Sequence, residues 1–272
     1  MTVADRRARF HALHQREGIF VMPNPWDIGS AKIMQALGFE ALATTSAGFA
    51  LTLGRRDQQV TRDELVAHVR AVAAEVDVPL SVDSERLFAP DPAGVAETVR
   101  MLADAGAAGC SIEDYDPDTD AIDDVGAAAE RVAAAVEAAH GLDAPMVLTA
   151  RCENHLNGVD DLDDTIARLV AYRDAGADCL YAPGLTRPDQ IRAVVEAVGK
   201  PVNVLGLRGA PSVPDLEKLG VRRVSTGSLL ANAAYGSMVA GARELLASGT
   251  AEYSRVGLPP EVGETLGPYR KV

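Results

Sequence analysis

Cysteine is scarce in this sequence, and long apolar runs are absent from it. The three cysteines, Cys110, Cys152 and Cys179, are odd in number, and each lies in or beside an expected buried strand. This pattern argues against a disulfide framework and predicts core thiols rather than catalytic ones. No stretch of about 18 apolar residues and no basic, apolar leader occurs, which indicates a cytoplasmic protein without a membrane segment.

Positive charge is also in short supply. The chain carries 26 Lys and Arg against 39 Asp and Glu, a formal net charge of −13. This balance opposes affinity for phosphate backbones and anionic lipids, so neither nucleic acid nor a membrane is an expected partner. A small anionic substrate stays compatible with it, because local arginines and a bound metal govern the field in a pocket. The glycine patterns of dinucleotide sites and P-loops are absent as well.

Eight short apolar runs alternate along the chain with helix-like stretches rich in Ala, Val, Leu, Glu and Arg. Continuous apolar runs are typical of buried parallel strands, and the stretches between them are long enough for crossover helices. The expected strands lie within residues 18–24, 41–46, 79–85, 109–114, 144–153, 178–184, 201–207 and 222–228. The clearest helices are expected over residues 61–75, 92–105, 124–140, 160–175 and 188–198. The alternation predicts an α/β protein.

The helix boundaries repeat the same signals. Thr61 followed by Glu64 is a capping-box pattern, and Pro92 occurs where a helix should begin. Four segments, ALGF, DAGAAG, DAGADC and KLGVRR, each have Gly just after an expected helix, as a left-handed cap requires. An apolar strand begins directly after each of them. Eight such units favour a closed (β/α)₈ TIM-type barrel over an open doubly wound sheet. We expect the barrel over residues 1–248 and a C-terminal helical appendage, possibly exchanged between subunits, over residues 249–272.

Acidic side chains follow the third and fourth expected strands, at the carboxyl ends where barrel enzymes hold their sites. Asp83 and Glu85 are two residues apart, so on a regular strand both would face one pocket, and Glu113 and Asp114 follow the next run. Oxygen ligands suit Mg²⁺ or Mn²⁺, and Mg²⁺ uses one or two direct carboxylates and several waters. Asp83 and Glu113 are the strongest candidates. The alternative is that these acids cap helices or pair with cations such as Arg86.

Two further segments carry polar groups to the same end of the barrel. Arg151 ends the fifth strand, where a guanidinium could grip a carboxylate or phosphonate in bidentate fashion or serve as a structural ion-pair partner. Residues 44–48 form a small, hydroxyl-rich loop that could offer N–H groups and hydroxyls to an anionic oxygen, or could be an ordinary polar turn. The connection beyond it could hold Asp57 over the barrel mouth.

These motifs resemble the isocitrate lyase and phosphoenolpyruvate mutase superfamily. The most specific pieces are ATTSAGFALTLGRRD after the second strand, DSE after the third, IED after the fourth and TARCE at the end of the fifth. The resemblance covers most of the chain. It implies an α/β barrel that binds Mg²⁺ and a small keto or hydroxy carboxylate, and that makes or breaks a C–C or P–C bond next to a carbonyl through an enolate.

The resemblance also implies a metal site. Asp83 would bind the metal directly, whereas Glu85, Glu113 and Asp57 would act largely through metal-bound water. Metal chelation of the keto and carboxylate oxygens would lower the cost of enolate charge.

A substrate site is implied beside it. Thr45 and the amides of Ser46 and Ala47 would hold the substrate's oxygens, and Arg151 would bind its carboxylate and stabilise negative charge. We count Asn203, in the seventh expected strand, among the substrate-binding residues as well.

The chain departs from the family pattern at several points. The Cys-containing loop of lyase members is replaced by EDYDPDTDAIDD, and the lysine of mutases and phosphonopyruvate hydrolases after the Glu-Asp pair is replaced by Tyr115. Residues 86–89 read Arg-Leu-Phe-Ala where members have Gly-Tyr-Gly, so the loop geometry should differ. The sixth strand lacks the family's histidine or glutamate. Candidates for the missing acid or base are Asp57, Tyr115, Tyr181 and His155.

Three functions therefore remain open at the level of sequence. The first is a Mg²⁺-dependent lyase that cleaves a C–C bond in a small 2-hydroxy or 2-oxo acid. The second is a hydrolase or decarboxylase of the oxaloacetate or phosphonopyruvate type, and the third is a non-catalytic barrel that binds keto acids. By resemblance, we expect a homo-oligomer, either a tetramer or a dimer.

Overall fold

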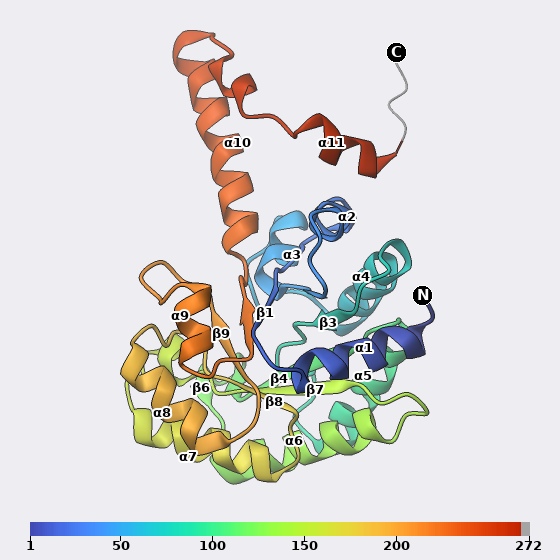
Figure 1. Ribbon diagram of the computed structural model, residues 1–272, viewed down its shortest axis with the longest axis vertical. Coiled ribbons are helices and arrows are strands. Elements are labelled where there is room, and N and C mark those ends of the chain that lie inside the picture. The colour runs from blue at the N-terminus through green and yellow to red at the C-terminus, as the bar shows by residue number, and fades with distance from the viewer. Residues whose placement is uncertain (268–272) are drawn as a thin grey trace.

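The computed structural model describes residues 1–267 and has at its centre eight parallel strands rolled into a nearly closed barrel (Figure 1). All eight predicted strands are present. In order around the barrel they are β1 (Phe20–Met22), β10 (Arg223–Ser225), β9 (Val202–Leu205), β8 (Cys179–Tyr181), β7 (Val147–Arg151), β4 (Gly109–Glu113), β3 (Leu80–Val82) and β2 (Leu42–Ala43). The Ala43 N–H donates to the Pro23 carbonyl at 3.1 Å, which brings β2 beside β1. The predicted α/β barrel is confirmed.

Helices between the strands surround the barrel (Figure 1). They are α2 (Ile28–Ala36), α3 (Ser46–Thr52), α4 (Arg62–Glu75), α5 (Pro92–Asp104), α6 (Val125–His140), α7 (Leu162–Asp174), α8 (Pro188–Val198) and α9 (Val213–Lys218). The predicted capping box is formed, because the Thr61 side chain accepts from the Glu64 N–H and the Glu64 carboxylate accepts from the Thr61 N–H. Helix α4 accordingly begins at the predicted place.

The four recurrent glycines end helices as predicted. Gly38, Gly106, Gly176 and Gly220 have φ angles of +92°, +97°, +106° and +87°. Each lets the chain leave a helix in a left-handed conformation and start the next strand within a few residues. Their shared geometry explains why the four sequence segments that contain them are similar.

Helix α1 (Val3–Gln15) covers the amino-terminal end of the barrel, a role that the sequence had not indicated. The Arg7 guanidinium donates to the carbonyls of Ala103 and Ala107 at 2.8 and 2.9 Å. The carbonyl of Ala103 lies in the last turn of α5, where a cation is favoured by the helix dipole. This end of the barrel is closed, so the opposite end, where the strands terminate, is the one left for a site.

The segment after β4 differs from the prediction. It forms a short antiparallel hairpin of β5 (Tyr115–Asp116) and β6 (Ala121–Ile122), where only a loop was expected. A 3₁₀ turn, η1 (Asn154–Asn157), follows β7.

Helix α10 (Leu229–Ser248) rises away from the barrel (Figure 1). It is followed by η2 (Glu252–Arg255), α11 (Pro260–Gly263) and η3 (Glu264–Leu266), which match the helical appendage that we expected. The division into a barrel and a tail at residue 248 stays a prediction, and positions 268–272 of that tail lie outside the described residues. Across residues 1–267, no helix is long and apolar enough to cross a membrane.

Candidate active site

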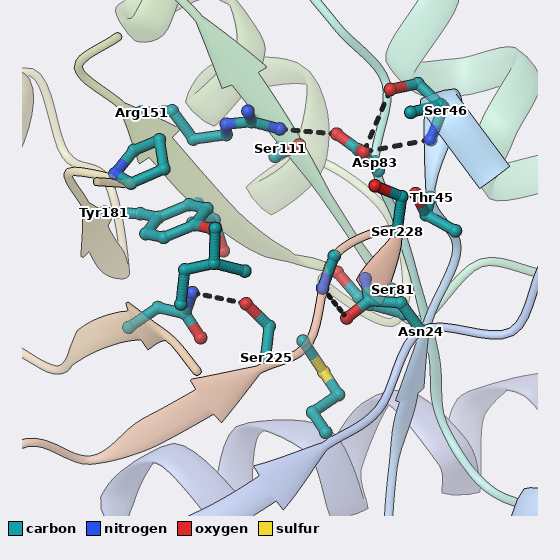
Figure 2. Close-up of a pocket in the computed structure, with 18 of the residues that line it drawn as sticks. Asn24, Thr45, Ser46, Ser81, Asp83, Ser111, Arg151, Tyr181, Ser225 and Ser228 are labelled. Atoms are coloured by element: carbon teal, nitrogen blue, oxygen red, sulfur yellow. Dashed lines mark hydrogen bonds and ion pairs between the residues drawn. The ribbon is translucent and has the colours of Figure 1, made fainter. Parts of the chain in front are cut away.

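A cavity of about 160 Å³ opens at the carboxyl ends of the barrel strands (Figure 2). Eight of the residues named from the sequence line it: Thr45, Ser46, Ala47, Asp57, Asp83, Arg151, Tyr181 and Asn203. Glu113 and Tyr115 instead line an adjoining hollow of about 190 Å³, which shares Ser46, Asp57 and Arg151 with the main cavity. Glu85 lines neither hollow. The structure thus gathers most, but not all, of the predicted set around one opening.

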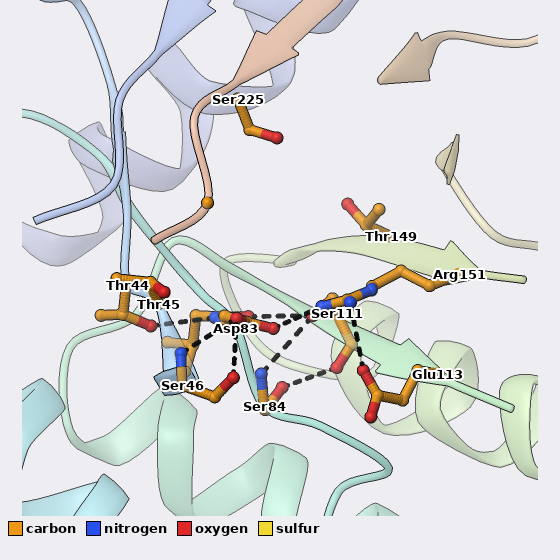
Figure 3. A network of polar contacts seen from close by, with 12 residues as sticks. Thr44, Thr45, Ser46, Asp83, Ser84, Ser111, Glu113, Thr149, Arg151 and Ser225 are labelled. Atoms are coloured by element: carbon orange, nitrogen blue, oxygen red, sulfur yellow. Dashed lines mark hydrogen bonds and ion pairs between the residues drawn. The ribbon is translucent and has the colours of Figure 1, made fainter. Parts of the chain in front are cut away.

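Arg151, the last residue of β7, is the centre of the charged groups. Its guanidinium forms an ion pair with Asp83 and a second with Glu113 at 3.3 Å (Figure 3). A third ion pair joins it to Glu153 at 2.8 Å. It also lies 5.3 Å from the centre of the Tyr181 ring, which is within the range of a cation–π contact. One buried guanidinium group therefore holds three carboxyl groups together at the mouth of the cavity.

Asp83 is hydrogen-bonded directly to the polar loop that follows β2. The Ser46 N–H and hydroxyl donate to Asp83 Oδ2 at 3.0 and 3.2 Å (Figure 3). Thr45 is the N-cap of α3, and its hydroxyl accepts from the Gly48 N–H at 3.2 Å. The Ser46 amide, predicted to hold a substrate oxygen, thus contacts the predicted metal ligand here.

Asp83 and Glu85 do not share one face of a strand, contrary to the prediction. Strand β3 ends at Val82, so both carboxylates lie in the turn beyond it, where Glu85 has a φ of +49°. Two following residues, Leu87 and Phe88, are also left-handed, with φ angles of +62° and +56°. The turn adopts at non-glycine residues the kind of torsion that the glycines of other members would allow, and each such residue costs about 1–3 kcal/mol.

Burial raises the pKa of two carboxyl groups near Asp83. Burial, followed by the charges of Asp83 and Asp57, raises the pKa of Glu85 to about 8. Burial also raises the pKa of Glu113 well above its ordinary value, against the opposing charge of Arg151. Desolvation is the main cause of both shifts, and the charge of Asp83 adds to each.

The side chain of Asp57, in the loop before α4, reaches the mouth of the cavity. The residue as a whole is exposed, but its carboxyl group lines the cavity, where desolvation and then the Asp83 charge raise its pKa. Its neighbour Gln58, with a φ of +63°, donates from Nε2 to Glu113 Oε1 at 2.9 Å. The loop is thereby held across the opening, as the sequence had indicated.

The implied Mg²⁺ would need oxygen ligands at the cavity. Within residues 1–267 no three His, Cys, Asp or Glu side chains are placed so that they could together hold a metal ion. Glu85 Oε1 is nevertheless buried without a hydrogen-bond partner among the described residues, and it lies near the charges of Asp83 and Asp57. Mg²⁺ commonly uses one or two carboxylates and keeps several waters. The residues therefore fit this cation, with Asp83 as the carboxylate that faces the cavity.

Other predicted residues have structural partners. Asp114 pairs with Arg168 at 3.4 Å and accepts from the Tyr172 hydroxyl at 2.6 Å, which agrees with the alternative that this acid pairs with a cation. The Tyr115 hydroxyl donates to Asp120 of its own hairpin at 2.8 Å. His155 lies beside Thr165, with Nε2 at 3.2 Å from the hydroxyl.

Two charged residues of the site were missed. Glu153, within the TARCE motif, holds Arg151 from the side away from Asp83, and its place two residues after Arg151 was a usable signal. Arg223 lines the floor of the cavity, and an arginine inside an otherwise apolar strand could have drawn attention to it. The cysteines Cys110, Cys152 and Cys179 are buried and, in the described part of the chain, none lines the cavity.

Comparison with known proteins places the chain in a family. The family model described as phosphoenolpyruvate phosphomutase matches residues 10–246. The chain belongs to this family. Within the phosphoenolpyruvate phosphomutase family and its superfamily, members are lyases and mutases that act on small keto acids and related carboxylates.

Similar proteins show how varied the family is. An oxaloacetate decarboxylase from Paraburkholderia xenovorans is 34% identical over 234 residues, 82% of this chain and 75% of that protein. The 2-methylisocitrate lyase of Escherichia coli is 30% identical over 203 residues, 71% and 67% of the two chains. A solved structure of a candidate lyase or mutase from Burkholderia cenocepacia J2315 has a TM-score of 0.94 and 48% identity, and the match covers 98% of this chain and 97% of that one.

Proposed function

We propose that this protein is a Mg²⁺-dependent lyase that cleaves a C–C bond in a small 2-hydroxy or 2-oxo carboxylate through an enolate. The observation that supports it most is the contact between Arg151 and Asp83 on the wall of the same cavity that Ser46 and Ala47 line. A guanidinium, a carboxylate and backbone amides at one opening can bind a carboxylate and stabilise charge that develops beside it.

The charge balance supports the metal. Arg151 is already shared among three carboxyl groups, so a second cation at Asp83 would help this site to hold an anionic substrate. We propose that Asp83 binds Mg²⁺ directly and that Glu85, Glu113 and Asp57 act through water. When bound, the cation supplies positive charge to the substrate's oxygens and to the enolate.

The chain's own residues account for binding and proton transfer. Arg151 orients the substrate's carboxylate, and Thr45 with the Ser46 and Ala47 amides holds its oxygens. Asp57, whose pKa is raised, accepts the hydroxyl proton of a 2-hydroxy acid as the C–C bond breaks. The electrons of that bond form the enolate of the released fragment, which then takes up a proton.

A decarboxylase is the second candidate, and one observation favours it. Lyase members use a cysteine as acid or base, yet none of the three cysteines lines the cavity within the described residues, and burial raises the pKa of Cys110 to about 12. Loss of CO₂ from a 3-carboxylated 2-oxo acid such as oxaloacetate needs no proton to be removed beforehand. The bond breaks to CO₂ and an enolate that Arg151 can stabilise.

A screen of small keto and hydroxy acids by NMR, with and without Mg²⁺, tests these candidates. Glyoxylate or another aldehyde acid among the products supports the lyase, whereas CO₂ and pyruvate support the decarboxylase. Oxalate with acetate, or phosphate, indicates a hydrolase. The Arg151→Ala variant serves as the control for uncatalysed decay. Binding of oxalate without turnover of any acid would leave only a keto-acid-binding barrel.

We also propose a homo-oligomer, a dimer or a tetramer, in which α10 packs on another copy. Of its residues only Ala231 and Gly241 are buried within the described chain. Its exposed apolar side chains include Leu230, Met238 and Leu246, and the last is 89% exposed. Apolar side chains spread along a projecting helix are typical of a surface that another subunit covers.

A further inference from the structure

The interior of the barrel below Arg151 is polar. In barrels of this type bulky branched side chains usually fill the interior in layers. Here the side chains around the lower cavity include Ser81, Ser111 and Ser225 (Figure 2), together with Thr149 and Asn203. Small hydroxyl groups leave room where leucine or isoleucine would close the barrel. We call this lower part of the cavity the inner chamber.

Arg223 forms the floor of the inner chamber and is 3% exposed. Its Nε donates to Asn203 Oδ1 at 2.9 Å and its Nη2 to Thr149 Oγ1 at 3.0 Å. Its Nη1 lies 3.1 Å from His14 Nε2. Within residues 1–267 this arginine makes no ion pair, although guanidinium stays charged at all ordinary pH values.

His14 does not supply a negative charge to balance the guanidinium of Arg223. Its Nδ1 lies 2.8 Å from the Phe10 carbonyl, so the ring donates there and offers Nε2 as an acceptor to Arg223. Every partner of Arg223 is thus neutral. A buried charge without a counter-ion is costly, and an arginine has five N–H donors, of which three have the partners given above.

The inner chamber is continuous with the proposed active site. Thr149, which contacts Arg223, and Arg151, which contacts Asp83, both line the cavity and lie two residues apart on β7. Two residues along a strand span roughly 7 Å. Arg223 contacts the side chain of Thr149 and Arg151 follows two residues later on the same strand, so the two guanidinium groups serve one cavity at successive depths.

We propose that the inner chamber is an anion subsite in which Arg223 binds the second carboxylate of a dicarboxylate substrate. This rests on the proposed function, because it names the substrate class of the same site. The first carboxylate lies at Arg151, and the chain of the substrate runs down the barrel past Thr149. Monocarboxylates of the same length leave Arg223 without a counter-ion and bind more weakly.

Paired ligands test the proposal by calorimetry in the presence of Mg²⁺. L-Malate and 2-hydroxybutyrate differ at the far carbon, which is a carboxylate in the first and a methyl group in the second. The wild type is expected to bind malate at least about tenfold more tightly, as one charged hydrogen-bonded contact predicts. In Arg223→Gln this preference should disappear, while the affinity for oxalate, which mimics the enolate at the proposed Mg²⁺ site, stays within about twofold.

A second variant keeps the test decisive if Arg223→Gln fails to fold. Thr149→Asp places a carboxylate against Arg223, supplies the missing counter-ion inside the protein and should also abolish the preference for malate. A wild type that binds oxalate but does not prefer malate would overturn the inference and leave the proposed function standing. A preference that persists in folded Arg223→Gln and in Thr149→Asp would overturn it too. Absence of Mg²⁺-dependent oxalate binding, in contrast, would count against the proposed function itself.

Discussion

Arg151 and Asp83 contact each other although they come from β7 and from the turn after β3, with β4 between these strands. Removal of either partner leaves a charge without its neighbour. The two residues are nevertheless proposed to differ in role, since Asp83 would hold the metal and Arg151 the substrate. Their variants should therefore fail in different ways.

Asp83→Ala is expected to abolish Mg²⁺-dependent binding of oxalate, an enolate mimic. Arg151→Ala should weaken oxalate binding by roughly 100-fold, as the loss of a buried charge partner predicts, while the metal still binds. Calorimetry with Mg²⁺ and then oxalate measures both steps. Unchanged oxalate affinity in Asp83→Ala would refute the metal assignment.

A matched control for these variants is Glu40→Gln. Glu40 pairs with Arg16 at 2.7 Å on the surface, remote from the cavity. Loss of this ion pair should leave oxalate binding unchanged, because the pair does not contact the cavity. It should also have little effect on folding, since surface ion pairs contribute about 0–1 kcal/mol to stability.

Asp57 and Tyr115 can be separated as acid or base candidates. Asp57→Asn should lower kcat by about 100-fold, because its carboxyl group lines the cavity and general acid–base catalysis contributes at least that much. Tyr115→Phe should change kcat by less than about threefold, since its hydroxyl donates to Asp120 and not into the cavity. Steady-state kinetics on the substrate found by the NMR screen gives both values. A larger loss of kcat in Tyr115→Phe than in Asp57→Asn would instead assign the proton transfer to Tyr115 in the β5–β6 hairpin.

Much of the fold could be predicted because its signals are local. The glycines at 38, 106, 176 and 220 mark helix-to-strand joints by a backbone requirement that few other residues meet. The apolar runs reveal the strands because both faces of each strand are buried. The place of helix α1 could not be predicted from such local signals, since its arginines bind carbonyls more than 60 residues away along the chain.

The site was predictable only in part. Asp83 and Arg151 stand out because each follows a strand and matches a motif. The direction of Glu85 depends on a left-handed torsion in a turn without glycine, which no periodic pattern encodes. The partners of Arg223 come from β7, β9 and α1, so its uncompensated charge becomes visible only when the barrel closes.

Two glycine variants test the geometry of the joints. A Cβ at Gly176, where φ is +106°, would lie 2.8 Å from Val136 Cγ1. Gly199 has a φ of +59°, and no described atom lies within 4 Å of its added Cβ. Gly199→Ala should cost about 1 kcal/mol in the free energy of unfolding, and Gly176→Ala about 1–3 kcal/mol more. Urea denaturation of both variants measures the difference, and equal losses would contradict the predicted clash.

The proposed oligomer predicts an effect of charge on α10. Met238 and Leu246 are 61% and 89% exposed, so Met238→Glu with Leu246→Glu should leave the fold intact while opposing burial against another copy. Light scattering after gel filtration should then show a lower mass than that of the wild type. The control is Leu37→Glu, which is 61% exposed at the end of α2. A wild type that is monomeric would end the proposal.

His14 gives the fold a defined dependence on pH. Burial, and then the charge of Arg223, lowers the pKa of His14 from 6.5 to about 3 in the folded protein. Between these two values the unfolded chain binds a proton at this residue and the folded chain does not. The contribution of His14 to stability is therefore complete above pH 6.5 and is lost as the pH falls toward 3, by at most about 1.4 kcal/mol per pH unit.

His14→Gln isolates this contribution, because glutamine can accept from Arg223 but does not titrate. Carboxyl groups with raised pKa values, such as Glu85, are common to both proteins and cancel in the difference. At pH 7 the variant should be the less stable protein, by about 1–2 kcal/mol for one poorly replaced buried partner. Urea denaturation between pH 7 and pH 4 should show the gap closing and then reversing as the pH falls. A gap that stays constant would mean that the imidazole is already protonated at neutral pH or remains accessible to solvent, and neither state fits its place between Phe10 and Arg223.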